Sequence, residues 1–277
     1  MLRQPPNYYL TQQLPLMQTQ LQRYFAQRVK LLFNHLHEFE LTGSEVSLHD
    51  FRVELKKLRA IIKFLRSVYP KQKLKQASYH LRNIFQSAGE IREYQIVQQW
   101  LHKHELAVIE KHYFPEEKMD IMVKAFHARS SDFKMQLKEV IDQCSKFIQT
   151  TNSILAEQYV VELHAQMSKL LRKPPAHSDW HELRKVIKQW MYAINWVAQE
   201  EDADHTLSYF NKLQESIGQW HDLEVIKDTF SIKQIYLSPD MDIQKDFSKA
   251  WEKLSHSLRY REKQVEDLLL KNLVTVN

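Results

Sequence analysis

The stretch HDFRVELKKLRAIIKFLR, residues 49–66, decides how this chain folds. Its cationic residues are spaced three or four positions apart, which places all of them on one face of an α-helix. An apolar residue precedes each cation and lies about 100° away around the helix. The cations are His49, Arg52, Lys56, Arg59, Lys63 and Arg66, and the apolar partners are Leu48, Phe51, Leu55, Leu58, Ile62 and Leu65. The stretch therefore predicts a helix with a core face beside a cationic face.

A stripe of like charges does not stabilise a helix by itself. Exposed cations four residues apart repel by a few tenths of a kcal/mol, and only Asp50 and Glu54 stand nearby to offset them. An isolated charge run is usually a solvated face. This run is of one sign and, as described next, duplicated, so we expect an anion to lie along it.

The His-x-x-Arg-x-x-x-Lys pattern returns 132 positions later, in residues 181–188, which read HELRKVIK. Its cations are His181, Arg184 and Lys188, and Met191 and Asn195 continue the face without charge. The apolar neighbours of this second stripe are Trp180, Leu183, Ile187, Trp190 and Ile194. The second segment therefore predicts another helix with adjacent core and cationic faces, with fewer charges than the first.

Two of the three glycines extend this repeat, because Gly89 and Gly218 align at an offset of 129 positions. Each is followed four residues later by an acid, and two further pairs keep the same offset. The acids are Glu93 and Asp222, and the further pairs are Lys124 with Lys253 and His127 with His256. Matches in the same order predict two related halves, residues 15–150 and 151–274.

Composition indicates an all-α fold. The chain has 3 glycines in 277 residues, where average usage would give roughly nineteen, so tight hairpin turns are scarce. Apolar residues recur at helical spacing. We expect helices at 16–40, 47–69, 72–88, 92–112, 117–150, 153–171, 178–200, 204–217, 221–231 and 241–272.

The remaining bulk features narrow the class of protein. A net charge of +5 permits an acidic partner without requiring one. The single cysteine, Cys144, allows no intrachain disulfide. No apolar run reaches the length of a membrane span, and residues 1–10 lack a signal-peptide core. We expect a cytoplasmic protein with no membrane partner.

The two basic helices, each followed by a glycine and an acid, resemble the CHAD family, the conserved histidine α-helical domain. The resemblance covers residues 15–272. It implies two four-helix-bundle halves related by a pseudo-twofold, with a central basic pore or groove. Family members usually carry Arg-Asp after the glycine, where this chain has Arg92-Glu93 and His221-Asp222. They also carry a cation at the position of Met191.

The resemblance implies binding of inorganic polyphosphate and association with polyphosphate granules. The residues expected to bind it are His49, Arg52, Lys56, Arg59, Lys63, Arg66, Arg82, Arg92, His127, His181, Arg184, Lys188, His221 and His256. Repeated cations suit a polyanion without bases, because Arg forks bind phosphate oxygens and Lys adds mobile charge. An anion should raise the pKa of nearby histidines, so binding should weaken as pH rises. No cofactor is expected.

Two other functions remain as the main alternatives, and a pure protein-scaffold role is a third. His49 with Asp50, or His221 with Asp222, could serve a metal-assisted phosphohydrolase, but adjacent helical residues point in different directions. A nucleic acid could use the stripe through its phosphate backbone. The modest net charge and the absence of a recognisable nucleic-acid motif disfavour that partner. We therefore expect a binding protein and not an enzyme.

Overall fold

The computed structural model describes residues 19–172, 175–197, 205–233 and 235–275. In these ranges all regular structure is helical, as expected. The helices are α2 (Gln20–Thr42), α3 (Glu45–Val68), the 3-10 turn η2 (Lys71–Leu74), α4 (Lys75–Lys103), α5 (Ala107–Tyr113), α6 (Glu116–Ala128), α7 (Ser130–Thr150), α8 (Ser153–Leu171), α9 (His177–Ile194), α10 (His205–Ile232), the 3-10 turn η3 (Ile235–Leu237) and α11 (Met241–Thr275).

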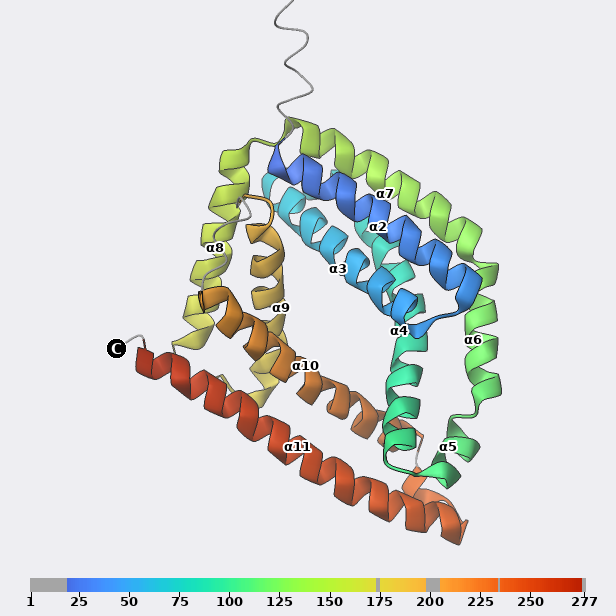
Figure 1. Cartoon of the computed structure of the whole chain (residues 1–277). Helices are drawn as coiled ribbons and strands as arrows, with labels where there is room; N and C mark the ends of the chain where they lie inside the picture. The colour runs from blue at the N-terminus through green and yellow to red at the C-terminus, as the bar shows by residue number, and fades with distance from the viewer. Residues whose placement is uncertain (1–18, 173–174, 198–204, 234, 276–277) are drawn as a thin grey trace, which may run out of the picture.

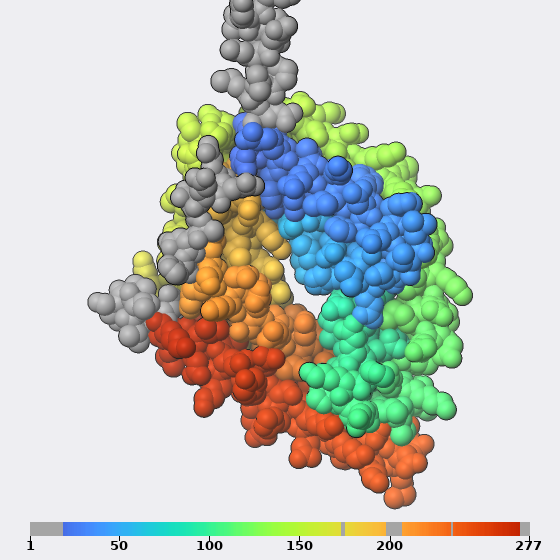
Figure 2. Space-filling view, viewed as in Figure 1, coloured from blue at the N-terminus to red at the C-terminus, as the bar shows by residue number. Residues whose placement is uncertain are grey.

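The helices are arranged around an open centre (Figure 1). Helices α3, α4, α9 and α10 face this centre, and α2, α7, α8 and α11 lie outside them. The space-filling view shows a hollow between α9 and α10 on one side and α3 and α4 on the other (Figure 2). Among the described residues, no helix combines the length and apolarity needed to cross a bilayer.

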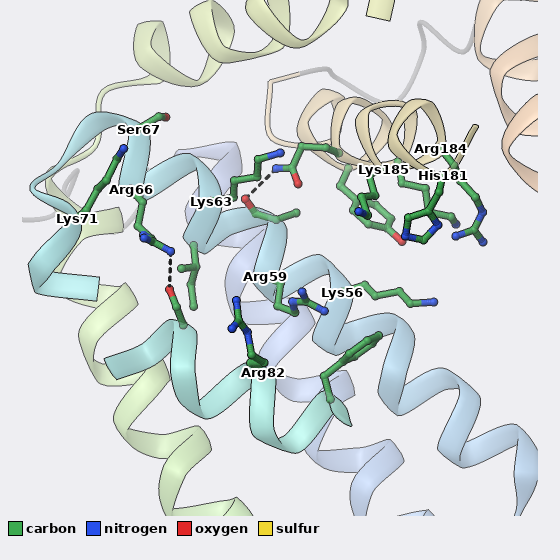
Figure 3. A pocket seen from close by; sticks show the side chains of 17 residues that line it. Lys56, Arg59, Lys63, Arg66, Ser67, Lys71, Arg82, His181, Arg184 and Lys185 are labelled. Carbon is green, nitrogen blue, oxygen red and sulfur yellow. Dashed lines mark hydrogen bonds between the residues drawn. The ribbon is translucent and has the colours of Figure 1, made fainter. Parts of the chain in front are cut away.

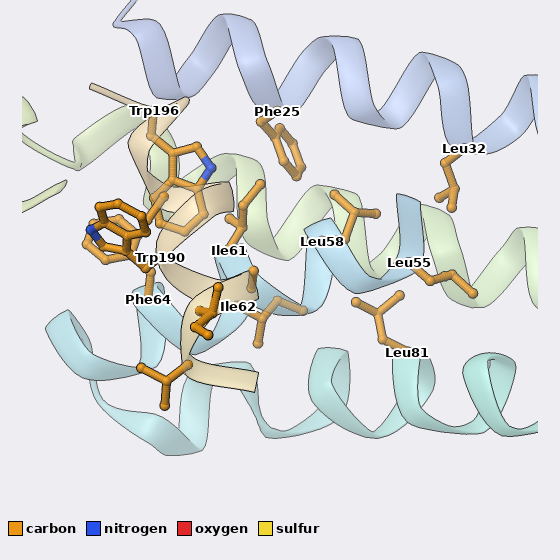
Figure 4. Packing of buried hydrophobic residues seen from close by; sticks show 14 of the residues in the cluster. Phe25, Leu32, Leu55, Leu58, Ile61, Ile62, Phe64, Leu81, Trp190 and Trp196 are labelled. Carbon is orange, nitrogen blue, oxygen red and sulfur yellow. The ribbon is translucent and has the colours of Figure 1, made fainter. Parts of the chain in front are cut away.

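The apolar face of α3 lies in the larger of two cores, which we call the first core (Figure 4). All six apolar residues predicted for this face are 0–3% exposed. The first core contains residues of α2, α3, α4 and α7 together with residues of α8, α9 and α10. It therefore joins the segments before and after residue 150 into one packed unit.

A second core lies at the opposite side of the open centre. There Tyr94, Trp100 and Phe114, from α4 and the segment after α5, pack with Ile226 and Phe230 of α10. Helix α11 completes it with Ile243, Ala250, Leu254 and Leu258. The chain before residue 150 and the chain after it thus meet at two places, with the hollow between them.

Four predicted helix boundaries were wrong. Residues 72–88 and 92–112 were expected as separate helices, but α4 runs unbroken through Gly89. Likewise 204–217 and 221–231 form the single helix α10, which runs through Gly218. Glycine costs a helix interior about 0.5–1 kcal/mol, which packing on both sides can offset.

The other two errors are helices that were predicted as continuous and are divided. The predicted helix 92–112 is interrupted after Lys103, where α4 ends, and resumes at Ala107, where α5 begins. The predicted helix 117–150 is divided at Arg129. This residue has φ −96° and ψ 1°, so it ends α6 and begins α7. Parts of other predicted helices, residues 16–18, 198–200 and 204, lie outside the described residues.

The Phe64 ring links α3 to the chain after residue 150. It is fully buried, and its centre lies 5.1 Å from the ring of Tyr159 and 5.4 Å from that of Trp196. We expect Phe64→Ala to lower the free energy of unfolding by about 3–5 kcal/mol, because it leaves a cavity among these rings. Urea unfolding measures the change. Tyr79→Ala, at a side chain 57% exposed, should cost far less, and equal losses would contradict this account of the core.

Candidate functional site

A cavity of about 960 Å³ opens between α3, η2 and α4 on one wall and α9 on the other. We call it the cationic cleft (Figure 3). Its first wall carries Lys56, Arg59, Lys63, Arg66, Lys71 and Arg82, and its second wall carries His181, Arg184, Lys185 and Lys188. In the part of the chain that the structure describes, no aspartate or glutamate lines it. The two predicted stripes therefore face one shared space.

The charges of the cleft are left almost without carboxylate partners. Lys185 Nζ lies 3.3 Å from Glu182 Oε2. Within the described ranges, no other cation lining the cleft has a carboxylate oxygen within 4.0 Å. Arg66 Nη1 donates instead to the Ser78 hydroxyl, at 3.3 Å. Since concentrated like charge is unfavourable by itself, this arrangement is suited to an external anion.

One arginine of each stripe is fixed against the backbone of a neighbouring helix. Arg52 Nη1 donates to the Phe85 carbonyl at 3.1 Å, and Arg184 Nε donates to the Gln214 carbonyl at 3.1 Å. Each carbonyl belongs to the residue four positions before a helical glycine, Gly89 or Gly218. The same contact thus occurs at matching places of the two stripes.

The glycines are explained by this contact. A Cβ on Gly89 would lie 2.8 Å from Arg52 Nη1, and a Cβ on Gly218 would lie 2.9 Å from Arg184 Nη2. Neither glycine has a positive φ, in contrast to Gly43 at φ 63°. Gly89 and Gly218 therefore serve the close approach of a guanidinium and do not serve a turn.

The two walls are joined by a buried hydrogen bond beside the cations. Gln189 Nε2, next to Lys188 in sequence, donates to the Ala60 carbonyl at 2.9 Å and to Tyr159 Oη at 3.3 Å. Ala60 lies on α3 beside Arg59. This bond connects α9 directly to the α3 backbone, so it fixes the separation of the two stripes.

Two lysines of the cleft, one on each wall, have lowered pKa values. Burial, with Arg52, Arg184 and Lys188 nearby, lowers the pKa of Lys56 to about 7. Burial and then Arg184 lower the pKa of Lys188 to about 8. Burial also lowers the pKa of Arg52 and Arg184, but guanidinium groups stay charged at neutral pH. Around neutral pH the lysines respond to pH and the arginines do not.

The histidines lie at one end of the cleft. The rings of His181 and His221 are 4.8 Å apart, and His49 lies within electrostatic reach of Arg92 and Lys56. Burial is the largest cause that lowers the pKa of all three histidines. These directions describe the free protein, and the raised histidine pKa expected beside a bound anion stays a prediction. Among the described residues, no group of three His, Cys, Asp or Glu side chains could hold a metal.

The structure brings most of the predicted site residues together. Those that line the cleft are Lys56, Arg59, Lys63, Arg66, Arg82, His181, Arg184 and Lys188. Arg52 adjoins it through Phe85, and His49, Arg92 and His221 lie at the histidine end. His127 and His256 were predicted to belong to the same site, but neither lines the cleft. His127 packs on Phe39 at 5.4 Å, and His256 is exposed on α11, because matching sequence places need not face the same space.

Among the residues that line the cleft, Lys185, Lys71 and Phe85 were not predicted as site residues. Lys185 stands four positions after His181 and three before Lys188, so its spacing carried the signal. Lys71 follows Pro70, beyond the end of α3, and η2 brings it to the cleft. Phe85 was noted only as a neighbour of Gly89, and nothing in its own helix distinguishes it from a core residue.

Fold and cleft together define a protein that is helical throughout its described elements, with a cleft lined by cations from two walls and, among the described residues, by no carboxylate. The CHAD domain family model matches residues 23–231, which is most of the chain. The protein therefore belongs to the CHAD family. A comparison with curated proteins finds no match.

Replacement of Gly89 by Ala should show that this glycine makes room for Arg52, whereas Gly43 serves a turn. The added methyl group displaces the Arg52 guanidinium, which is the flexible end of a side chain, so α4 should stay folded and gain up to about 1 kcal/mol of stability. NMR of the Arg52 guanidinium should show that its hydrogen bond to the Phe85 carbonyl is broken. Gly43→Ala should instead cost about 1–2 kcal/mol, because Gly43 has a positive φ. An unchanged Arg52 signal would refute the assignment.

Proposed function

We propose that this protein binds inorganic polyphosphate in the cationic cleft and does not break it down. The observation that carries the proposal is a cavity lined by cations from two walls, with one carboxylate partner among them in the described residues. A linear polyanion carries charge on every unit and offers no bases to read. Repeated cations along a line match it, and counterion release would supply much of the affinity, by analogy with other phosphate polymers.

We also propose that residues 15–150 and 151–274 are related halves that face each other across a central basic pore. The paired contacts of Arg52 with the Phe85 carbonyl and of Arg184 with the Gln214 carbonyl support this relation. Membership in the CHAD family supports polyphosphate as the ligand. Association with polyphosphate granules follows as part of the same proposal.

The test is a calorimetric titration of long-chain polyphosphate at about 150 mM salt, near physiological ionic strength. The variant Arg59→Glu/Lys63→Glu changes two exposed cations of the cleft, so it leaves the core intact. We expect the affinity to fall at least roughly tenfold. We also expect the slope of log K against log salt to become shallower by about 1.4, or about 0.7 for each phosphate that the variant no longer neutralises.

A matched control keeps the charge change and moves it elsewhere. Lys138→Glu/Lys146→Glu alters two exposed lysines of α7, which does not line the cleft, and should bind almost as well as the wild type. Duplex DNA serves as competitor. Displacement of polyphosphate by DNA at equal phosphate concentration would favour a nucleic acid instead. Absence of polyphosphate binding by the folded wild type would refute the proposal.

Binding should take up protons and weaken as pH rises. In the free protein Lys56 and Lys188 have pKa values of about 7 and about 8, and a bound anion raises both toward the usual value. Above its free pKa each lysine must be protonated to bind, which costs up to tenfold in affinity per pH unit. Calorimetry at pH 6 to 9, in buffers of different ionisation enthalpy, measures both effects. A constant affinity between pH 7 and 9 would contradict the role of the lysines.

A further inference from the structure

One aromatic ring of the cleft, that of Phe85, lies close to three cations. The centre of the Phe85 ring lies 4.4 Å from Arg52 Cζ, 4.7 Å from Arg59 Cζ and 5.9 Å from Lys56 Nζ. All three distances fall within the range of cation–π attraction. Phe85 belongs to α4, whereas the cations belong to α3. The ring therefore reaches across a helix–helix contact to the middle of the first stripe.

The ring opposes a tendency of these cations to separate. Arg52, Lys56 and Arg59 follow one another on one face of α3, where like charges repel, and burial lowers the pKa of each. The negative face of an aromatic ring attracts cations without supplying a net charge. A carboxylate in this place would also hold the cations, but it would repel an anion. An aromatic ring holds them and leaves their charge available.

Among the described residues, the second stripe has no aromatic ring that contacts three of its cations. Gln214 takes the place of Phe85, since its carbonyl accepts from Arg184 as the Phe85 carbonyl accepts from Arg52. The Gln214 side chain donates to Asn211 Oδ1 at 2.9 Å. Lys188 Nζ lies 5.8 Å from the ring centre of Tyr192, so that ring holds one cation of the stripe. An aromatic ring therefore lies near three cations on the α3 wall and near one cation on the α9 wall.

We propose that Phe85 is a positioning residue that gathers three cations of α3 before the anion arrives, which makes the α3 wall the principal binding surface. The proposal rests on the proposed function of the cleft. Ordering a long side chain on binding costs about two- to tenfold in affinity. A ring that orders three of them in advance should therefore contribute at least roughly tenfold.

The experiment compares polyphosphate affinities of folded variants by calorimetry. Phe85→Leu removes the ring and keeps the apolar volume near the core, and we expect a loss of at least roughly tenfold. Phe85→Trp should restore most of the affinity, because indole attracts cations more strongly than benzene does. Phe33→Leu is the matched control, since Phe33 is also half-buried against the first core and does not line the cleft. It should bind like the wild type.

Fluorinated phenylalanines at position 85 separate positioning from packing. Fluorine withdraws electrons from the ring face and barely changes its size, so log K should fall stepwise with each added fluorine while the melting temperature stays constant. An affinity that does not depend on fluorination, or a Phe85→Leu variant that binds as tightly as the wild type, would overturn the role of Phe85. Absence of binding by the wild type would instead overturn the proposed function, so the two failures are distinguishable.

Discussion

Burial of the apolar face of α3 holds its cationic face in place. Each large apolar side chain removed from water contributes about 1.5–3 kcal/mol, whereas repulsion between exposed neighbouring cations costs a few tenths. Leu48, Phe51, Leu55, Leu58, Ile62 and Leu65 are all buried, so their combined gain exceeds this repulsion. Burial of the cations, which lowers the pKa of Lys56 to about 7, adds a further cost. The folded protein can therefore keep the stripe together without an anion. The same balance applies on α9, where Trp180, Leu183 and Ile187 are buried beside the second stripe.

The cations of the cleft fall into two kinds. Arg52 and Arg184 donate to backbone carbonyls at matching places, and Gly89 and Gly218 make room for their guanidinium groups. Because guanidinium stays protonated, these arginines supply a constant charge in a defined direction. The lysines are compact point charges on flexible stems, and burial beside other cations brings their pKa values close to neutral pH. The cleft thus combines fixed positive charge with charge that an anion and pH can adjust.

The position of the cleft follows from the two places where the chain before residue 150 packs against the chain after it. The first core joins α3 to α9, and the second joins α4 to α10 and α5 to α11. Gln189 adds a direct bond from α9 to the α3 backbone. Neither stripe can move away from the other without opening a core, so the site is already assembled in the free protein. Preassembly lowers the ordering cost of binding.

The sequence by itself determined the helical class, the two stripes and their matched glycines, because helical periodicity is a local property that spacing reveals. It could not show that Gly89 lies inside a continuous helix. That glycine makes room for the guanidinium of Arg52, which belongs to another helix. The arrival of Lys71 and Phe85 at the cleft, and the separation of His127 from it, were likewise decided by tertiary structure. Which side chains meet depends on how helices distant in sequence pack, and so does the burial that sets the lysine pKa values.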